Sequence, residues 1–224
     1  MIWFTSDTHY NHKNIVRGTS EWELGLDRTQ RVRDFDTLED HNAKLVENFN
    51  KLVKPDDELY HLGDWSFGGI SNIWNFRKQL KCKNIHMILG NHDHHIENNK
   101  RITITKQEFI DNDYLLAYDV IGSTAYVDIK DLFSSTSHYK SISINGQKII
   151  LCHYAMRVWE KSHKGSWMLY GHSHGTLPED ASRRSMDVGV DTNDLKPYSY
   201  SEIHDKFKNR SVLLSVDHHS ENTN

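Results

Sequence analysis

The chain has 224 residues, enough for one sizeable domain that buries a core without disulfide staples. Its 27 basic and 31 acidic residues give a net charge of −4, which argues against the basic face of a general nucleic-acid-binding protein. It has only two cysteines, Cys82 and Cys152, which favours a protein of the reducing cytoplasm. No apolar run approaches the ~20 residues of a membrane helix, so no membrane partner is expected.

The first half of the sequence alternates short apolar runs with amphipathic stretches. Ile2 to Ser6 predicts a buried first strand, and residues 36–53 predict a helix because their apolar residues recur on one face. A strand over 58–64, a helix over 71–81 and a third strand from residue 84 into Gly90 follow. This strand–helix–strand order indicates an α/β fold with a partly parallel sheet.

The second half of the sequence predicts several strands and one further helix. Residues 141–153 predict a β-hairpin, since Asn145-Gly146 lies between two β-favouring runs. The remaining expectations are strands over 167–175 and 185–191, a helix near 199–208, a last strand over 211–216, and loops over 96–113 and 177–184. Residues 1–216 would then form one domain, and the polar tail 217–224 is expected to be disordered.

Polar residues with metal-binding side chains follow five of these strands. They are Asp7 and His9, Asp64, Asn91 with His92, His153, and His172 with His174. In an open α/β sheet, ligands bind at the carboxyl ends of the strands, so these residues are expected to converge there. Residues two apart on an extended segment point to the same side, so Asp7 and His9 are expected to reach one ion together, and His172 and His174 to reach a shared site.

Each of these short motifs has an ordinary explanation when it is taken alone. Asp-x-His is commonly a solvated turn, Gly-Asp is frequent in all proteins, and His153 alone is typical of a hydrogen-bonded strand residue. The ordered set is much more specific, because each member stands at the end of a predicted strand. Its side chains indicate a metal centre built from carboxylate, imidazole and amide groups.

From residue 7 to residue 174, the order Asp-x-His, Gly-Asp, Gly-Asn-His-Asp, a lone His and Gly-His-x-His resembles the calcineurin-like metallophosphoesterase superfamily, in particular its small single-domain bacterial and phage members. The resemblance implies a four-layer α/β/β/α sandwich with a dinuclear metal centre. It implies two ligand sets with one bridging carboxylate: Asp7, His9 and His174 for one ion, Asn91, His153 and His172 for the other, and Asp64 between them. It also implies that His92 faces the substrate as the proton donor.

The activity implied by the resemblance is hydrolysis of a phosphomonoester or phosphodiester by a hydroxide that bridges two divalent ions. His92 would protonate the leaving oxygen as general acid. Nitrogen and oxygen ligands without thiolates suit Mn²⁺ first, with Fe, Zn²⁺, Ni²⁺ and Mg²⁺ as alternatives. The substrate would be a phosphorylated small molecule or a nucleotide, and the sequence specifies neither its identity nor the oligomeric state.

Other functions of the same centre also have to be weighed. A nuclease or a cyclic-nucleotide phosphodiesterase could use it, although the acidic net charge does not indicate a nucleic-acid partner. A non-catalytic metal-binding scaffold is disfavoured, because His92 and every ligand are present. The run from Gly63 to Gly68, "GDWSFG", lacks the second acid and the arginine of the protein phosphatases in the superfamily. This departure argues against a protein substrate and leaves the residue that orients His92 unassigned.

Five further residues are candidates for contact with the substrate. They are His12, Lys13, Arg33, Tyr154 and Arg157. The first two follow the Asp-x-His motif closely enough to touch a phosphate. Arg33 precedes the helix predicted over 36–53, and the last two follow His153. The neighbouring histidines at 94 and 95 are expected to lie in a loop beyond the site.

Overall fold

The structure, a computed structural model, describes residues 1–22, 32–115 and 119–212. Its first sheet contains β1 (Ile2–Thr5), β2 (Glu58–His61), β3 (Asn84–Ile88), β7 (Ser135–Ser137) and β12 (Tyr198–Ser199). The strands β1, β2, β3 and β7 run parallel in that order, and β12 pairs antiparallel with β1 at the edge. The partly parallel sheet expected from the sequence is therefore confirmed.

The second sheet contains β8 (Tyr139–Ile144), β9 (Gln147–Cys152), β10 (Trp167–Tyr170) and β11 (Ser185–Asp187). The strands β9, β10 and β11 are parallel, whereas β8 pairs antiparallel with β9. The predicted hairpin is confirmed, because Asn145 and Gly146 join β8 to β9 with φ angles of 50° and 81°. A two-residue hairpin turn of this kind needs both residues in the left-handed region.

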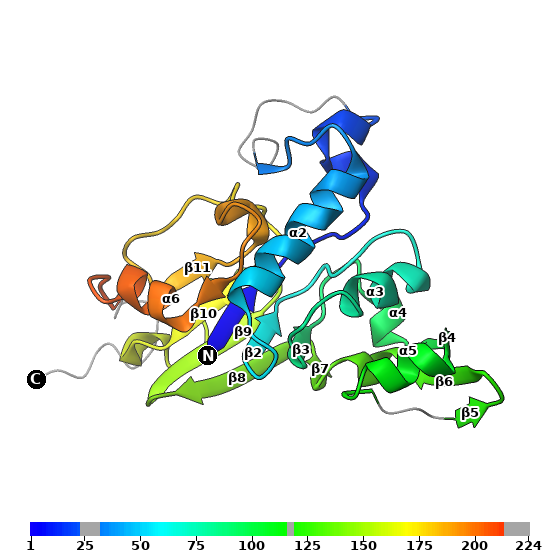
Figure 1. The fold of residues 1–224 in the computed structure, drawn as a ribbon. Coiled ribbons are helices and arrows are strands. Elements are labelled where there is room, and N and C mark those ends of the chain that lie inside the picture. The colour runs from blue at the N-terminus through cyan, green and yellow to red at the C-terminus, as the bar shows by residue number, and fades with distance from the viewer. Residues whose placement is uncertain (23–31, 116–118, 213–224) are drawn as a thin grey trace, which may run out of the picture.

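The two sheets lie face to face and share one apolar core (Figure 1). Alternation along each strand divides its side chains between the two faces of the sheet. Phe4 of β1 points into the space between the sheets, whereas its neighbour Trp3 packs on the outer side of the first sheet. In β9, Leu151 belongs to the core between the sheets and Ile150 packs on the outer side of the second sheet.

Helices cover the outer face of the first sheet. α2 (Leu38–Leu52) begins after Thr37, whose hydroxyl accepts a hydrogen bond from Asp40 N, and α3 (Ile70–Arg77) follows β2. Phe49 of α2 and Phe76 of α3 are buried in the same apolar cluster as the inner strands. These two helices agree with the expectations for residues 36–53 and 71–81.

The remaining layers are thinner. α6 (Tyr200–Phe207) starts with a capping box formed by Ser199 and Glu202, and its apolar side chains join the core between the sheets. The outer face of the second sheet is covered by Trp159 and the 3₁₀ turn η4 (Ser162–Lys164). The other short 3₁₀ turns are η1 (Lys13–Ile15), η2 (Arg17–Thr19), η3 (Ile129–Leu132) and η5 (Val190–Thr192). Two stacked sheets flanked by such layers form an α/β sandwich, in agreement with the fold class expected from the sequence.

The expectation of a loop over residues 96–113 is wrong, because most of this segment forms helices and a strand. The segment contains α4 (His94–Glu97), β4 (Arg101–Thr105) and α5 (Lys106–Asp111). A third, antiparallel sheet is formed by β4, β6 (Thr124–Asp128) and β5 (Asp119–Ile121). In this sheet β6 lies in the middle and pairs with both β4 and β5. Figure 1 shows this sheet to one side of the other two. The sequence carried the signal, since Ile102 and Ile104 alternate with polar residues and are buried.

Other expectations concern segments at the end of the chain. Residues 177–184 are irregular, as predicted. Most of the strand expected over 211–216 and all of the tail 217–224 lie outside the described residues, and 211–212 are irregular. Cys82 and Cys152 are both free thiols. Within the described ranges, every helix is too short or too polar to cross a membrane.

Candidate metal centre

Loops that follow five strands meet at one end of the stacked sheets. They follow β1, β2 and β3 in the first sheet and β9 and β10 in the second. Two groups of side chains there place one ligand atom per residue within 4.8 Å of one another: Asp7, His9 and His174, and Asp64, His153 and His172. The structure thus brings together the residues that the motifs assign to two ligand sets.

The first group surrounds the Asp7 carboxylate, which is fully buried. Asp7 Oδ1 lies 3.9 Å from His9 Nε2 and 3.8 Å from His174 Nε2. His9 is 2% exposed, whereas the His174 side chain keeps 23% of its surface open to solvent. One carboxylate oxygen and two imidazole nitrogens therefore point at a common position that solvent reaches from the His174 side.

The second group surrounds His153, which is 1% exposed. His153 Nε2 lies 3.5 Å from Asp64 Oδ2 and 3.1 Å from Asn91 Oδ1. His172 belongs to the same group and is exposed, as Asn91 is. Asn91, which the sequence places among the ligands of the second ion, therefore does lie beside His153.

Asp64 joins the two groups through a single atom. Its Oδ2 oxygen lies 3.3 Å from His9 Nε2 in the first group and 3.5 Å from His153 Nε2 in the second. The other oxygen, Oδ1, accepts a hydrogen bond of 3.0 Å from His92 N. This arrangement leaves Oδ2 placed between the two imidazoles, where a ligand shared by two ions would stand.

The residues present fit divalent ions of the first transition row. Both ring nitrogens of His9 are buried, and neither makes a hydrogen bond within the described part of the chain. Buried polar atoms nearly always have a partner, and His9 Nε2, which faces the carboxylates of Asp64 and Asp7, is placed to bind a metal ion between them. Imidazole, carboxylate and amide donors without a thiolate suit Mn²⁺, Fe or Zn²⁺ more than a closed structural zinc site.

Two of the imidazoles are oriented from behind by oxygen acceptors. His153 Nδ1 lies 2.7 Å from Leu62 O, and His174 Nδ1 lies 2.7 Å from Asp191 Oδ2. A carbonyl or carboxylate oxygen can only accept, so Nδ1 carries the proton in both rings. In the neutral form of each ring, a proton on Nδ1 leaves the Nε2 lone pair for a metal ion, which is the usual arrangement of metal-binding histidines.

Arg33 lies behind the site, which corrects the expectation that it contacts the substrate. Its Nε and Nη2 donate to the two oxygens of Asp191 at 2.7 and 2.9 Å. Nη1 and Nη2 also donate to the main-chain oxygens of Thr8 and Asp7 at 3.3 and 2.6 Å, and Nη1 lies 3.0 Å from His41 Nε2. The guanidinium is fully buried with these contacts, so it supports the Asp7 loop and does not face a ligand.

Asp93 holds two ligand loops together. Its carboxylate accepts hydrogen bonds from the main-chain nitrogens of Asp64 at 2.7 Å, Trp65 at 3.0 Å and Gly90 at 2.8 Å. Burial raises its pKa, although these main-chain donors act in the opposite direction. Asp93 is the last residue of the Gly-Asn-His-Asp motif, which was noticed in the sequence without a role for this position.

The backbone of the ligand loops is left-handed at five non-glycine residues. Asp7, His9, Asp64, His172 and His174 have φ angles of 55°, 44°, 58°, 67° and 47°. Such angles cost ~1–3 kcal/mol each and cluster at functional sites. Asp7 and His9 do lie together, but the expected reason, an extended segment, is wrong. Tight turns bring them together, and they place His172 and His174 in different groups.

A glycine permits the closest approach between two of these loops. A Cβ added to Gly171 would lie 1.9 Å from Ser6 Oγ and 2.4 Å from Asp7 Oδ2. The next residue, His172, donates its main-chain N–H to the same Asp7 carboxylate at 2.9 Å. Absence of a side chain at 171 therefore lets the loop after β10 hold Asp7 directly.

The two carboxylates have pKa values that shift in opposite directions. Burial raises the pKa of Asp7 to about 8, and the nearby Asp187 and Asp64 add to this shift. Burial acts in the same direction on Asp64, but contacts with His9, His153 and the main-chain N–H of His92 outweigh it and hold the pKa below its ordinary value. Burial lowers the pKa of His9 to about 3, so its ring is neutral, the form that binds a metal ion.

His92 lies at the edge of the two groups. Its ring centroid is 5.3 Å from that of His9 and 5.5 Å from that of Phe67, and the residue is exposed. His12 is buried beside it and stacks on Phe67 with a centroid distance of 3.9 Å and an interplanar angle of 12°. Of the candidate substrate contacts, His12 therefore lies at the site, although Phe67 covers one face of its ring.

The other candidate substrate contacts lie around the rim or away from it. The Tyr154 ring is 4.8 Å from the His172 ring and the residue is 48% exposed, so it stands at the mouth of the site. Lys13 points to Glu21, with 2.5 Å between Nζ and Oε1, and is half exposed. Arg157 is exposed, and its main-chain oxygen accepts a hydrogen bond from Arg183.

Comparisons with known proteins agree with this geometry. A family model described as calcineurin-like phosphoesterase matches residues 1–176. An uncharacterized protein of Methanocaldococcus jannaschii is 23% identical over 223 residues, 96% of each chain. The Gene 66 protein of Mycobacterium phage L5 is 23% identical over 199 residues, 84% of this chain and 86% of that protein. A solved protein of unknown function from Aquifex aeolicus covers 92% of this chain and 98% of its own, with 21% identity and a TM-score of 0.50, and supports the fold alone.

Proposed function

The chain belongs to the calcineurin-like phosphoesterase family, and from this premise we propose that it hydrolyses a phosphomonoester or phosphodiester with two bound divalent ions. The proposed ligands are Asp7, His9 and His174 for one ion, Asn91, His153 and His172 for the other, and Asp64 for both. Mn²⁺ is the proposed ion, and Fe, Zn²⁺, Ni²⁺ and Mg²⁺ share the same ligand preferences in part.

The position of Asp64 carries the proposal. A single oxygen of this side chain lies 3.3 Å from His9 Nε2 and 3.5 Å from His153 Nε2, although the two histidines belong to separate groups. A shared carboxylate is what fixes the spacing of two ions. The pKa of Asp64 is held below its ordinary value, so the side chain is ionised and ready for this role at neutral pH.

The chemistry divides between the bound ions and the chain. Such ions supply Lewis acidity at the phosphoryl oxygens and an activated water for attack on phosphorus. The chain holds its ligands in place beforehand, through Asp191 behind His174, Leu62 O behind His153 and Asp93 between two loops. Because these groups are fixed before a substrate arrives, little reorganisation is needed during the reaction.

His92 is the proposed general acid. Its main-chain N–H binds Asp64 Oδ1 at 3.0 Å, which keeps the residue beside the shared carboxylate, and its exposed ring can reach the leaving oxygen of a bound ester. Proton donation to a leaving group typically contributes ~10²–10⁴-fold to the rate. His92 is not among the proposed ligands, so its removal should leave both ions bound.

The same groups could also act on a cyclic nucleotide or a nucleic acid. The net charge of −4 gives no support to a nucleic-acid substrate, so we place phosphate esters of small molecules and nucleotides first. A non-catalytic scaffold is less well supported, because the ligands converge and His92 stands beside them.

The test is a substrate panel with a metal count. The purified chain is stripped with a chelator, reloaded with Mn²⁺ and assayed on phosphomonoesters, phosphodiesters, nucleotides and cyclic nucleotides. We expect two ions per chain and hydrolysis of at least one class. His138→Gln is the matched control, since this exposed histidine pairs with Glu97 outside the site. At most one ion at saturation would exclude the dinuclear centre, and no hydrolysis by the loaded chain would exclude the activity.

A further inference from the structure

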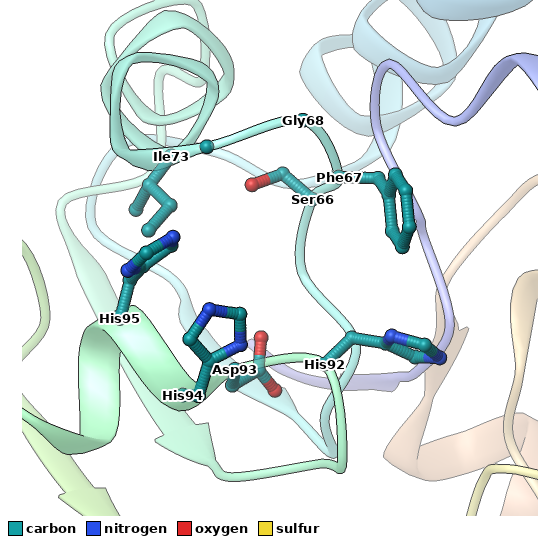
Figure 2. A pocket seen from close by; sticks show the side chains of 9 residues that line it. Ser66, Phe67, Gly68, Ile73, His92, Asp93, His94 and His95 are labelled. Carbon is teal, nitrogen blue, oxygen red and sulfur yellow. The ribbon is translucent and has the colours of Figure 1, made fainter.

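A small pocket opens beside His92. It lies between the segment from Ser66 to Ile73 and the residues from His92 to His95 at the start of α4 (Figure 2). None of its lining residues is a proposed metal ligand, and it shares only His92 with the proposed reaction. The pocket is therefore a place for a part of the substrate other than its phosphate.

Two buried polar atoms in this pocket make no hydrogen bond with the residues that the structure describes. They are Ser66 Oγ and His95 Nδ1. Ser66 is 7% exposed, and Figure 2 shows its hydroxyl oxygen turned into the hollow, on the side where the ring of His95 stands. Buried hydroxyl and imidazole atoms nearly always have partners, so this pair points to a ligand with hydrogen-bonding groups of its own.

The rest of the wall consists of Phe67, Ile73, two glycines, Asp93 and the rings of His92 and His94. Phe67 is 39% exposed, rests face to face on the buried His12, and meets His92 at an interplanar angle of 64°. Figure 2 shows Ile73 at the other end of the pocket from Phe67. An exposed ring that is held in place from behind is a stacking platform for a flat aromatic group.

The pocket has no permanently cationic side chain among the described residues that line it. Among the residues that the structure describes, no Lys, Arg or Glu lines it; its titratable lining residues are Asp93 and three histidines, His92, His94 and His95. The carboxylate of Asp93 already accepts three main-chain hydrogen bonds, so it is not free to bind a cation. A ligand that suits the pocket therefore combines a flat, uncharged face with hydrogen-bonding atoms on its edge.

We propose that this pocket binds a planar heteroaromatic group, of the kind found in a nucleobase, on the leaving alcohol of the substrate. This inference rests on the proposed function, because His92 donates its proton to the leaving oxygen and the pocket begins at His92. The leaving alcohol must therefore lie next to the pocket. A nucleoside supplies the flat face for Phe67 and edge atoms for Ser66 and His95, whereas a glycerol or serine alcohol would leave all three without a contact.

The first part of the test compares leaving groups. The values of kcat/KM for adenosine and cytidine monophosphates are measured against that for glycerol phosphate, with Mn²⁺. We expect a preference of about ten-fold or more for a nucleotide, since base–aromatic stacking alone is of this order. Phe67→Ala and Ser66→Ala should each reduce the preference several-fold. Ile121→Ala, a truncation of an exposed side chain on β5, is the control and should leave it unchanged.

The second part measures binding without catalysis. Adenosine and cytidine, which carry no phosphate, are titrated into the Mn²⁺-loaded chain and followed by NMR. Saturable nucleoside binding that Phe67→Ala weakens would support the proposed pocket. This holds even if no nucleotide and no glycerol phosphate is hydrolysed, and in that case only the proposed phosphoesterase function would be refuted. Equal kcat/KM values for nucleotides and glycerol phosphate, with no nucleoside binding, would overturn the inference and leave the phosphoesterase activity standing.

Discussion

Asp191→Asn is expected to weaken both the fold and the metal centre, because this buried carboxylate serves two partners. Asp191 is 1% exposed, accepts from Arg33 at 2.7 and 2.9 Å, and orients His174 at 2.7 Å. Removal of one partner from a buried ion pair typically costs ~3–5 kcal/mol, since the other charge is left unpaired. Loss of the group behind a metal-binding histidine typically lowers metal affinity ~10–100-fold. Both effects are expected in this one variant.

The assay is chemical denaturation of the metal-free chain, followed by Mn²⁺ titration. Asp180→Asn is the matched control, because Asp180 is 49% exposed and pairs with Arg183 at the surface, where such a pair contributes under ~1 kcal/mol. Burial raises the pKa of Asp191, but Arg33 outweighs burial and the net shift is downward. A depressed pKa stabilises the fold above the unfolded value of ~3.9 and loses this effect as the pH falls. The gap between wild type and variant should therefore shrink in acid.

A double variant separates stability from metal binding. Arg33→Met with Asp191→Leu replaces the buried ion pair by apolar side chains, an exchange that is often neutral or stabilising. We expect the double variant to recover most of the lost stability while its Mn²⁺ affinity stays low, because the carboxylate that orients His174 Nδ1 is gone. Wild-type stability and affinity in Asp191→Asn, or wild-type affinity in the double variant, would refute the reasoning.

Three more outcomes are expected. Asp64→Asn should reduce turnover and metal content more than Asp7→Asn, because only Asp64 would contact both ions; equal losses of turnover with both ions retained would argue against a shared carboxylate. His92→Ala should lose ~10²–10⁴-fold on alkyl esters but much less on p-nitrophenyl esters, whose leaving group needs no proton, and equal losses would remove the acid role. The pKa of Asp7 is raised to about 8 and that of His174 is raised as well, so Mn²⁺ binding near pH 7 should release protons, measured calorimetrically in two buffers, and Asp7→Asn should release fewer. A wild-type release from Asp7→Asn would contradict this.

Local patterns were sufficient to predict most elements and to single out the side chains that the structure brings together in two groups. The Asn145-Gly146 turn, the amphipathic helix after Thr37 and the polar residues after each strand are all encoded within a few neighbouring positions. The convergence of the ligands followed from a general rule on the carboxyl ends of strands, so it needed no knowledge of distant contacts. Family resemblance added the division into two ligand sets.

Residues that act from a distance escaped the sequence analysis. Asp191 and Arg33 are separated by 158 positions, and no local pattern connects them. Arg33 looked like a substrate contact because a lone arginine near a motif carries no sign of burial. The left-handed turns at the ligands also lack a sequence signal, since aspartate and histidine stand where glycine is the usual residue. The third sheet is different, because Ile102 and Ile104 alternate with polar residues along β4 and give a local signal for a strand.

The left-handed backbone at the proposed ligands is strained, and this strain lowers the net stability of the folded chain. Five residues at ~1–3 kcal/mol each approach the ~5–15 kcal/mol net stability of a typical domain. A glycine at His9 or His172 would relieve part of this strain and delete a ligand at the same time. Bound ions stabilise only the folded chain, and by an amount that grows with their concentration. Laboratory selection for heat tolerance in a chelator should therefore discard ligands first, whereas the same selection in Mn²⁺ should keep them.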